Sequence, residues 1–510
     1  MPHGYRTLID RIASQPAAAV AVAAPERASM SYGALDAFIG QTRARLRDLG
    51  IGRGDRVAIV LPNGPEMAVA FVAVAGAATT APLNPAYRAE EFAFYLQDLR
   101  ARAVLVAADE AGPIVDAARQ AGVAVLRAVV PADAAAGAFA IEGDPAGAAS
   151  DDGAPGPDDI ALILHTSGTT SRPKIVPLSH ANIAASAQHI AATLGLGPAD
   201  RVLNIMPLFH IHGLIAAVAS SLGAGGSIWC SPGFNALRFF AWLDEAQATW
   251  VTAVPTMYQA LLGRAERNAE IIARNPLRFL RSSSASLPPQ VMQALEGLFG
   301  CPVIESYGMT EATHQMASNP LPPRPRKPGS VGVAAGPEIA ILDERGAELA
   351  PGAIGEICIK GANVTAGYES NPDANAAAFT DGWFRTGDQG MLDAEGYLFI
   401  TGRLKELINR GGEKIAPREV DEVLMDHPAV AQAVTFAVPH DKLGEEVAAA
   451  IVLRADVLPI PDAPMLKDFV AQRLADFKVP RTILIVDEIP KGPTGKLQRI
   501  GLAKTLGLAS

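Results

Sequence analysis

The sequence predicts an α/β protein with a large N-terminal domain of parallel-type sheets and helices and a small α+β C-terminal domain. Residues 1 to about 150 alternate Ala-rich amphipathic helices with short apolar strands, for example at 56–61 and 103–106, as βαβ units do. Near the end of the chain, strands at 429–438, 447–453 and 483–486 and a helix at 465–474 complete the smaller domain. The length of 510 residues also exceeds what one hydrophobic core usually supports.

Three stretches near the N-terminus need individual interpretation. Residues 16–25 are rich in Ala and Val, but Asp10 interrupts the basic region before them, so a strand is favoured over a signal peptide. Residues 83–98 contain a helix that is expected to start at the proline end, with acidic residues early in the helix. Residues 131–157 are dominated by Ala, Asp, Gly and Pro, which predicts an exposed connector.

The middle of the chain contains one apolar stretch that is long enough to cross a bilayer. Residues 211–237 carry no formal charge, but the run GAGGS and Pro232 interrupt them, so a core helix, a turn and a strand are expected instead. Further strands are predicted at 250–255 and 355–361, and Pro417 is expected to open an amphipathic helix.

Composition restricts the partners and the compartment. Asp and Glu number 53 against 43 Lys and Arg, a formal net charge of -10, so nucleic acid and anionic membranes are poor candidate partners. Cys230, Cys301 and Cys358 are scattered and have no spacing typical of a zinc site or a disulfide framework. We therefore expect a cytoplasmic protein without an integral membrane segment, either a monomer or a homodimer.

The most informative stretch runs from the apolar strand 160–164 into the polar loop HTSGTTSRPK, which ends at Lys174. Gly168 allows positive φ, so that successive backbone N–H groups can turn toward one anion, and the hydroxyls and the lysine add donors. The loop lacks the second glycine of the G-x-x-x-x-G-K-[ST] motif. It predicts phosphate binding, with a solvated turn as the alternative. The predicted phosphate ligands are Thr166, Ser167, Gly168, Thr169, Thr170 and Lys174.

Five motifs in order carry a resemblance to a known family. They are HTSGTTSRPK, YGMTEAT (307–313), GWFRTGD (382–388), GRLKELINRGGEKI (402–415) and PTGKLQR (493–499). Together they resemble the adenylate-forming superfamily and its acyl-CoA synthetases. The resemblance implies the acyl-adenylate synthetase fold, ATP with Mg²⁺, and CoA as co-substrate. It also implies an adenylation domain at 1–402, a hinge at 403–405 and a mobile domain at 406–510 that carries the catalytic lysine.

The motifs supply candidate residues for the nucleotide. Tyr307 can stack on a purine, Thr310 can donate to the α-phosphate, and Glu311 can give an oxygen to Mg²⁺, which needs few protein ligands when phosphates fill its shell. Asp388, expected just after a strand, suits the ribose hydroxyls, although a lone TGD more often marks a turn. The resemblance assigns Arg403 to the ribose as well.

The resemblance also assigns roles near the C-terminus. Lys405 would be the pivot, Lys496 the catalytic lysine, and the pair Gly411 and Gly412 the backbone that approaches pantetheine. Without the motif, Lys496 would be interpreted as an ordinary solvated lysine.

The acid pocket is predicted from departures from the family pattern. Acyl-CoA synthetases usually carry two glycines where this chain has Ser283 and Ser284, and a small residue near His314. We therefore expect a small, polar pocket. In MPLFHIHG the resemblance places His210 between the acyl pocket and the thiol channel, while the sequence leaves open whether His210 or His212 faces the pocket; two histidines alone make a weak metal site.

The residues of the pocket motifs resemble those of the oxalate–CoA ligases of plants and fungi. Oxalate is small and doubly charged, so its second carboxylate requires buried donors. The direction of Arg281, the other cation of these motifs, is not fixed by the sequence. Malonate and short- or medium-chain acids remain alternatives, as do a luciferase-like monooxygenase and an adenylation module that loads a carrier protein. No carrier segment with a modified serine is visible before Ser510, which favours a stand-alone enzyme.

Overall fold

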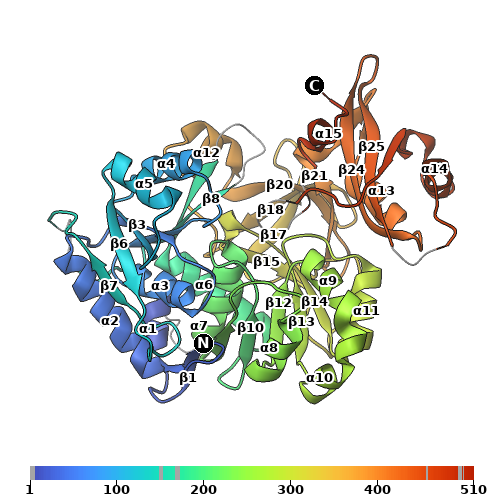
Figure 1. Cartoon of the computed structure of the whole chain (residues 1–510). Helices are drawn as coiled ribbons and strands as arrows, with labels where there is room; N and C mark the ends of the chain where they lie inside the picture. The colour runs from blue at the N-terminus through green and yellow to red at the C-terminus, as the bar shows by residue number, and fades with distance from the viewer. Residues whose placement is uncertain are drawn as a thin grey trace. The chain divides into compact units, whose positions relative to one another are not determined.

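The computed structural model describes residues 6–148, 153–166, 173–454, 458–491, 497 and 499–509, and the chain forms two compact units (Figure 1). Unit 1 comprises Met1–Pro328, Gly332–Glu338 and Lys360–Ala378. Unit 2 comprises Gly329–Val331, Ile339–Ile359 and Phe379–Ser510. Each unit is described by itself below.

The first sheet of unit 1 is parallel in its centre and antiparallel at both edges. The apolar runs predicted as strands become its buried central strands. Two helices, α4 (Ala89–Asp98) and α5 (Pro113–Ala121), pack their apolar faces on one side of it (Figure 1). In pairing order the strands are β7 (Ala140–Gly143), β6 (Ala124–Val129), β5 (Ala103–Ala107), β3 (Arg56–Val60), β4 (Thr79–Pro82), β8 (Ile160–Thr166) and β9 (Lys174–Ser179).

The second sheet of unit 1 is also parallel in its centre, with antiparallel edges. In pairing order its strands are β16 (Val333–Ala334), β15 (His314–Ser318), β14 (Val303–Met309), β13 (Phe279–Ser282), β12 (Trp250–Ala253), β10 (Arg201–Asn204), β11 (Ser227–Cys230), β1 (Val20–Ala23) and β2 (Met30–Ser31). The helices whose apolar residues pack on its outer face are α8 (Phe239–Ala246), α9 (Pro255–Ala265), α10 (Ala269–Arg274) and α11 (Pro289–Phe299).

Helices between the two sheets complete the layers of unit 1. Helix α6 (His180–Leu194) contacts β8 and β9 of the first sheet and β15 of the second, and α3 (Pro65–Ala75) contacts β3, β4 and β11. The predicted helix, turn and strand of 211–237 are present as the π-helix η1 (His212–Ala219), α7 (Ser220–Ala224) and β11. The remaining helices of the unit are α1 (Leu8–Ala13), α2 (Tyr32–Asp48), η2 (Glu266–Asn268), η3 (Thr310–Ala312) and α12 (Pro372–Ala378).

The structure corrects two details of the sequence analysis. Residues 131–157 are not only a connector, because β7 pairs antiparallel with β6 and buries Phe139 and Ile141 nearby. The helix of 83–98 starts later than expected, at Ala89, where the backbone N–H of Arg88 donates to the Glu91 carboxylate. The strand expected within 16–25 is confirmed as β1.

Unit 2 contains two further sheets. One has the order β17 (Glu338–Leu342), β18 (Gly355–Lys360), β20 (Trp383–Leu392) and β19 (Phe379–Thr380), with β21 (Leu398–Arg403) also paired to β20. The other has the order β23 (Glu413–Ile415), β22 (Ile408–Arg410), β25 (Gly444–Leu453) and β24 (Val430–His440), with β26 (Thr482–Ile485) paired to β25. The helices are η4 (Leu404–Glu406), α13 (Pro417–Met425), α14 (Ala463–Ala471), η5 (Asp476–Lys478) and α15 (Leu502–Thr505).

Within the part of the chain that the structure describes, no helix combines the length and apolarity needed to cross a bilayer.

Three buried or partly buried histidines predict how the stability of unit 1 depends on pH. Burial lowers the pKa of His165, His180 and His189, so each ring binds its proton less readily in the folded state. In the unfolded chain they bind protons near their ordinary pKa of about 6.5. The unfolded state therefore binds more protons as the pH falls below that value, and the free energy of unfolding decreases from pH 7 to pH 5. Denaturant unfolding at several pH values measures this slope. His180→Gln should make it shallower, and an unchanged slope would contradict the assignment.

Candidate functional site

The base of the predicted phosphate loop is formed by two paired strands. Thr166 at the end of β8 and Lys174 at the start of β9 are partners in the antiparallel ladder. Beside them, the His165 ring lies 2.9 Å from the Asp98 carboxylate, which fixes the end of β8. The predicted ligands Ser167, Gly168, Thr169 and Thr170 lie outside the described residues.

A tyrosine joins this loop base to the TEAT motif. The Tyr368 hydroxyl donates to Glu311 Oε1 over 2.9 Å, and the Lys174 ammonium lies 4.2 Å from the centre of the Tyr368 ring. Burial, and then the Glu311 charge, raise the pKa of Tyr368, so its hydroxyl stays a donor. Lys174 and Glu311, which were both predicted to bind ATP and its Mg²⁺, thus contact the same side chain, Tyr368. Thr310 opens η3 directly before Glu311, and Tyr307 lies near the end of β14.

The turn after Glu311 requires a close backbone approach. Strands β14 and β15 shift register at Gly308, where a Cβ atom would lie 1.8 Å from the His314 carbonyl oxygen. The Asn363 amide donates to the carbonyls of Ala312 and Gln315, at 2.7 and 3.0 Å, and so holds the turn that contains His314. His314 has φ +94°, a strained value for a residue other than glycine. The conformation of His314 is therefore imposed by its surroundings.

A second cluster assembles the predicted acid pocket around His212. The His212 ring is fully buried at the start of η1, and its Nδ1 lies 3.0 Å from Ser284 Oγ. The rings of His212 and His314 meet edge to face with centroids 4.9 Å apart. His212 thus stands between Ser284 and His314, two residues proposed for the same acid. Ser284 has φ +75°, in the left-handed region where glycine is preferred.

Arg281 lies beneath this cluster with no exposed surface. Its Nη1 donates to Thr252 Oγ1 at 3.3 Å and lies 3.4 Å from His212 Nε2, and its Nη2 donates to Gln315 Oε1 at 3.3 Å. Burial lowers the pKa of Arg281 to about 9, so the guanidinium is still a cation at neutral pH. Among the described residues no carboxylate forms an ion pair with it.

The remaining predicted pocket residues have different surroundings. The Ser283 hydroxyl is buried and donates to the Ser306 carbonyl at 3.0 Å, so it fastens β13 to β14. His210 is half-buried, and its Nδ1 accepts from the backbone N–H of His212 at 3.3 Å. Of the two histidines, His212 is the one in contact with Ser284.

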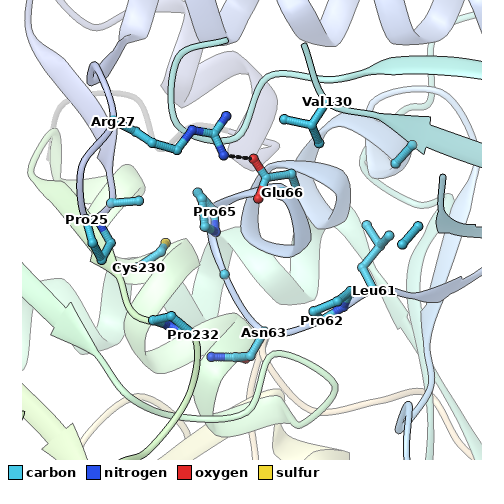
Figure 2. A pocket seen from close by; sticks show the side chains of 14 residues that line it. Pro25, Arg27, Leu61, Pro62, Asn63, Pro65, Glu66, Val130, Cys230 and Pro232 are labelled. Atoms are coloured by element: carbon cyan, nitrogen blue, oxygen red, sulfur yellow. Dashed lines mark hydrogen bonds and ion pairs between the residues drawn. The ribbon is translucent and has the colours of Figure 1, made fainter. Parts of the chain in front are cut away.

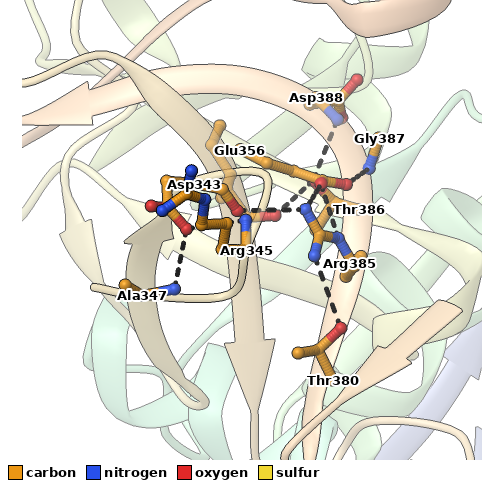
Figure 3. A network of polar contacts seen from close by, with 10 residues as sticks. Asp343, Arg345, Ala347, Glu356, Thr380, Arg385, Thr386, Gly387 and Asp388 are labelled. Atoms are coloured by element: carbon orange, nitrogen blue, oxygen red, sulfur yellow. Dashed lines mark hydrogen bonds and ion pairs between the residues drawn. The ribbon is translucent and has the colours of Figure 1, made fainter. Parts of the chain in front are cut away.

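Unit 2 holds the predicted ribose residues as an ion pair. Arg403 Nε and Nη2 donate to the two carboxylate oxygens of Asp388, at 2.7 and 3.3 Å. Asp388 lies inside β20, which corrects the expectation that it follows a strand. Glu356 on β18 holds the residues just before Asp388, because its carboxylate accepts from Arg385 and from the backbone N–H of Gly387 (Figure 3).

The predicted CoA and hinge residues are partly described. Lys405 is exposed in η4. Gly411 and Gly412 form the turn between β22 and β23 with φ of +61° and +101°, and a Cβ atom at Gly412 would meet no atom within 4 Å. Lys496 lies outside the described residues, but Arg499 in the same motif pairs with Asp421 and with Glu406 in η4.

A cavity of about 360 Å³ elsewhere in unit 1 contains none of the predicted site residues (Figure 2). It is lined mostly by apolar side chains, and an ion pair between Arg27 and Glu66, 2.5 Å long, crosses one wall. The guanidinium of Arg27 also donates to the carbonyls of Ala134 and Ala135, so its donors are used within the protein.

Glu311 is the residue predicted to bind Mg²⁺. The described residues contain no group of three or more His, Cys, Asp or Glu that could hold a metal ion. Glu311 is a single, 6% exposed carboxylate with one oxygen bonded to Tyr368. This donor set fits a Mg²⁺ ion that takes most of its ligands from phosphates and water.

Sequence reasoning missed several residues of these clusters. The sequence analysis gave a chemical role to none of four residues: Tyr368, Asn363, Thr252 and Gln315. Only contacts between residues that are distant in sequence reveal them. The single available signal was Arg281, a cation in an otherwise apolar and hydroxyl-bearing strand.

Two family models match most of the chain. A family model described as AMP-binding enzyme matches residues 9–369, and one described as AMP-binding enzyme C-terminal domain matches residues 419–496. The chain is 46% identical over 477 residues to an oxalate–CoA ligase from Arabidopsis thaliana, with 92% of each protein covered. It is 41% identical over 494 residues to an oxalate–CoA ligase from Saccharomyces cerevisiae, covering 90% of this chain and 88% of that protein. The crystal structure of ATP-bound MatB from Rhodopseudomonas palustris superposes with a TM-score of 0.87 at 30% identity, covering 99% and 98% of the two chains.

The close approach at Gly308 gives a direct test of the site's construction. Gly308→Ala should lower the free energy of unfolding by about 1–3 kcal/mol, because the added methyl group meets backbone that must move. The matched control is Gly297→Ala in α11, where a Cβ atom meets nothing within 4 Å and the helix should gain about 0.5–1 kcal/mol. Urea denaturation measures both. Equal stability of the two variants would contradict the register shift at Gly308.

Proposed function

The chain belongs to the AMP-binding enzyme family and is an AMP-forming acid–CoA ligase, and we propose that the acid it activates is oxalate. The family and the fold class expected from the motifs are thereby confirmed. The observation that carries the choice of acid is the cluster of His212, Ser284 and His314 above the buried Arg281 cation. Such a cluster suits a short acid with a second negative charge.

In the first half-reaction, an oxygen of the substrate carboxylate attacks the α-phosphorus of ATP, and the bond to pyrophosphate breaks. The product is an acyl-adenylate. Negative charge gathers on the α-phosphate, so donors fixed around it lower the barrier. We assign this work to Thr310, to the loop between Thr166 and Lys174, and to Lys496.

The nucleotide is proposed to be bound by residues of the predicted motifs. Tyr307 would stack on the purine, while Asp388 accepts hydrogen bonds from the ribose hydroxyls and Arg403 orients Asp388 through the ion pair. Glu311 would hold Mg²⁺, which neutralises phosphate charge when bound. Tyr368 orients the Glu311 carboxylate by donating to one of its oxygens.

The second half-reaction needs a thiol in place of the lysine. The sulfur of CoA attacks the acyl carbonyl, AMP leaves with the bonding electron pair, and the thiol proton passes to solvent. We propose that residues 406–510 rotate about the hinge 403–405, with Lys405 as pivot, so that Lys496 withdraws and the Gly411–Gly412 turn approaches pantetheine. His210 would then border the thiol's path. Because ATP and CoA are required, we propose a cytoplasmic location.

The choice of acid can be tested with a panel. CoA-dependent AMP formation should be fastest with oxalate when malonate, acetate, hexanoate, octanoate and 4-coumarate are compared in parallel. Ser284→Gly should lower kcat/KM for oxalate about tenfold or more, because one hydrogen bond to a charged group is lost. The unfolding temperature of this variant should change little, because glycine relieves the positive φ while the buried His212 Nδ1 loses its partner. His314→Ala should also weaken oxalate use. Hexanoate or octanoate turnover with oxalate inert would refute the proposed acid.

The two-step scheme predicts separable defects. Lys496→Ala should abolish adenylate formation, measured as oxalate-dependent exchange of pyrophosphate into ATP, by about a hundredfold or more. Thioester formation from a supplied oxalyl-adenylate should remain, because the lysine has withdrawn by then. Equal loss of both half-reactions would contradict the rotation about the hinge.

A further inference from the structure

A line of buried polar groups runs from Arg281 to Ser284 through two other side chains. The order is Arg281 Nη1 to Thr252 Oγ1 at 3.3 Å, Thr252 Oγ1 to His212 Nε2 at 2.6 Å, and His212 Nδ1 to Ser284 Oγ at 3.0 Å. The side chains of Arg281, Thr252 and His212 are fully buried. They come from β13, β12 and η1, so the line exists only in the folded unit.

The donors and acceptors in this line have one consistent assignment. A guanidinium can only donate, so Thr252 Oγ1 accepts from Arg281 and keeps its own proton for another acceptor. The nearest acceptor is His212 Nε2 at 2.6 Å, which also faces Arg281 Nη1 at 3.4 Å. Thr252 Oγ1 has a second lone pair, but a proton on Nε2 would lie beside the donor Nη1 of Arg281, so the contacts favour an unprotonated Nε2. A doubly protonated ring is disfavoured because the adjoining cation repels it.

The remaining proton of the ring then lies on Nδ1 and is donated to Ser284 Oγ. Because that oxygen already accepts from His212, its own hydroxyl proton points away from the ring. We propose that Arg281 and Thr252 are positioning residues that hold His212 in the Nδ1-protonated tautomer, so that the Ser284 hydroxyl is oriented to donate to the second carboxylate of the acid. This inference rests on the proposed function for the identity of that acid, but not for the tautomer.

The buried cation also explains why the line has a direction. Along this line each donor, beginning with Arg281 Nη1, points toward Ser284. A negative charge beyond Ser284 is therefore favoured by all of these donors, whereas a neutral group there gains little. The functional consequence is that the site recognises the second carboxylate by its charge rather than by its shape. The sharpest comparison is therefore between oxalate and oxamate, in which a neutral amide of similar size replaces that carboxylate.

The tautomer can be read directly in the full-length protein. Nitrogen-15 NMR of histidine-labelled protein at pH 7, with His212 assigned through His212→Asn, should show protonated Nδ1 and unprotonated Nε2. In Thr252→Val this preference should be lost, and Thr252→Ser should restore it. A ring protonated on Nε2, or on both nitrogens, in the unaltered protein would overturn the proposal whatever acid the enzyme uses.

The positioning role is tested by the ratio of kcat/KM for oxalate to that for oxamate. Thr252→Val should lower this ratio by about tenfold, the effect of one hydrogen bond in a charged network, and Thr252→Ser should restore it. The matched control is Thr80→Val in β4, which removes a fully buried hydroxyl that has no hydrogen-bond partner among the described residues, and the ratio should not change. Equal losses for both acids in Thr252→Val would reduce Thr252 to a packing role and overturn the proposal. If the unaltered enzyme fails with oxalate, the proposed acid is wrong, and the NMR result alone decides the tautomer.

Discussion

The packing of unit 1 must accommodate one charged side chain, Arg281, that has no surface exposed to solvent. The Arg281 guanidinium is fully buried and has no carboxylate partner among the described residues, so its desolvation must be offset by neutral acceptors. Thr252 and Gln315 supply hydroxyl and amide oxygens, and His212 lies within reach of the same Nη1 atom. These partners come from β12, β15 and η1, so the side chain of Arg281 on β13 links the helix η1 and two strands that are not adjacent in the sheet.

The other constraint is steric and concerns the turn that carries Glu311 and His314. Strands β14 and β15 approach so closely at Gly308 that no side chain fits there. Asn363 and Tyr368, both from the segment that follows β18, satisfy the turn's carbonyls and one oxygen of Glu311. Two stretches about fifty residues apart therefore fix one carboxylate and one imidazole. This construction lets His314 keep an unfavourable φ, since the surrounding hydrogen bonds outweigh the local strain.

Much of the fold was predictable because its signals are local. Apolar runs such as 56–61 and 250–255 became central strands, and Pro417 opens α13 as its position suggested. The errors have physical causes. The connector 131–157 contains β7, which the sequence analysis missed because a short edge strand needs few apolar residues. Asp388 lies on the buried face of β20, where a carboxylate is tolerated because Arg403 pairs with it. The roles of the phosphate loop and of Lys496 remain predictions, since those residues lie outside the described chain.

The sequence by itself determined the class of fold and the family, because glycine, hydroxyl and charge patterns within a motif encode local conformation and chemistry. The small, polar acid pocket stays a prediction from the same patterns. Only the tertiary structure decided which side chains meet. All four residues of β13 are buried, so the alternation that would reveal the direction of Arg281 is absent. His212 begins a π-helix, whose wider turn departs from the 3.6-residue period by which a helix face is assigned. The choice between His210 and His212 was therefore made by packing between β10, β15 and η1.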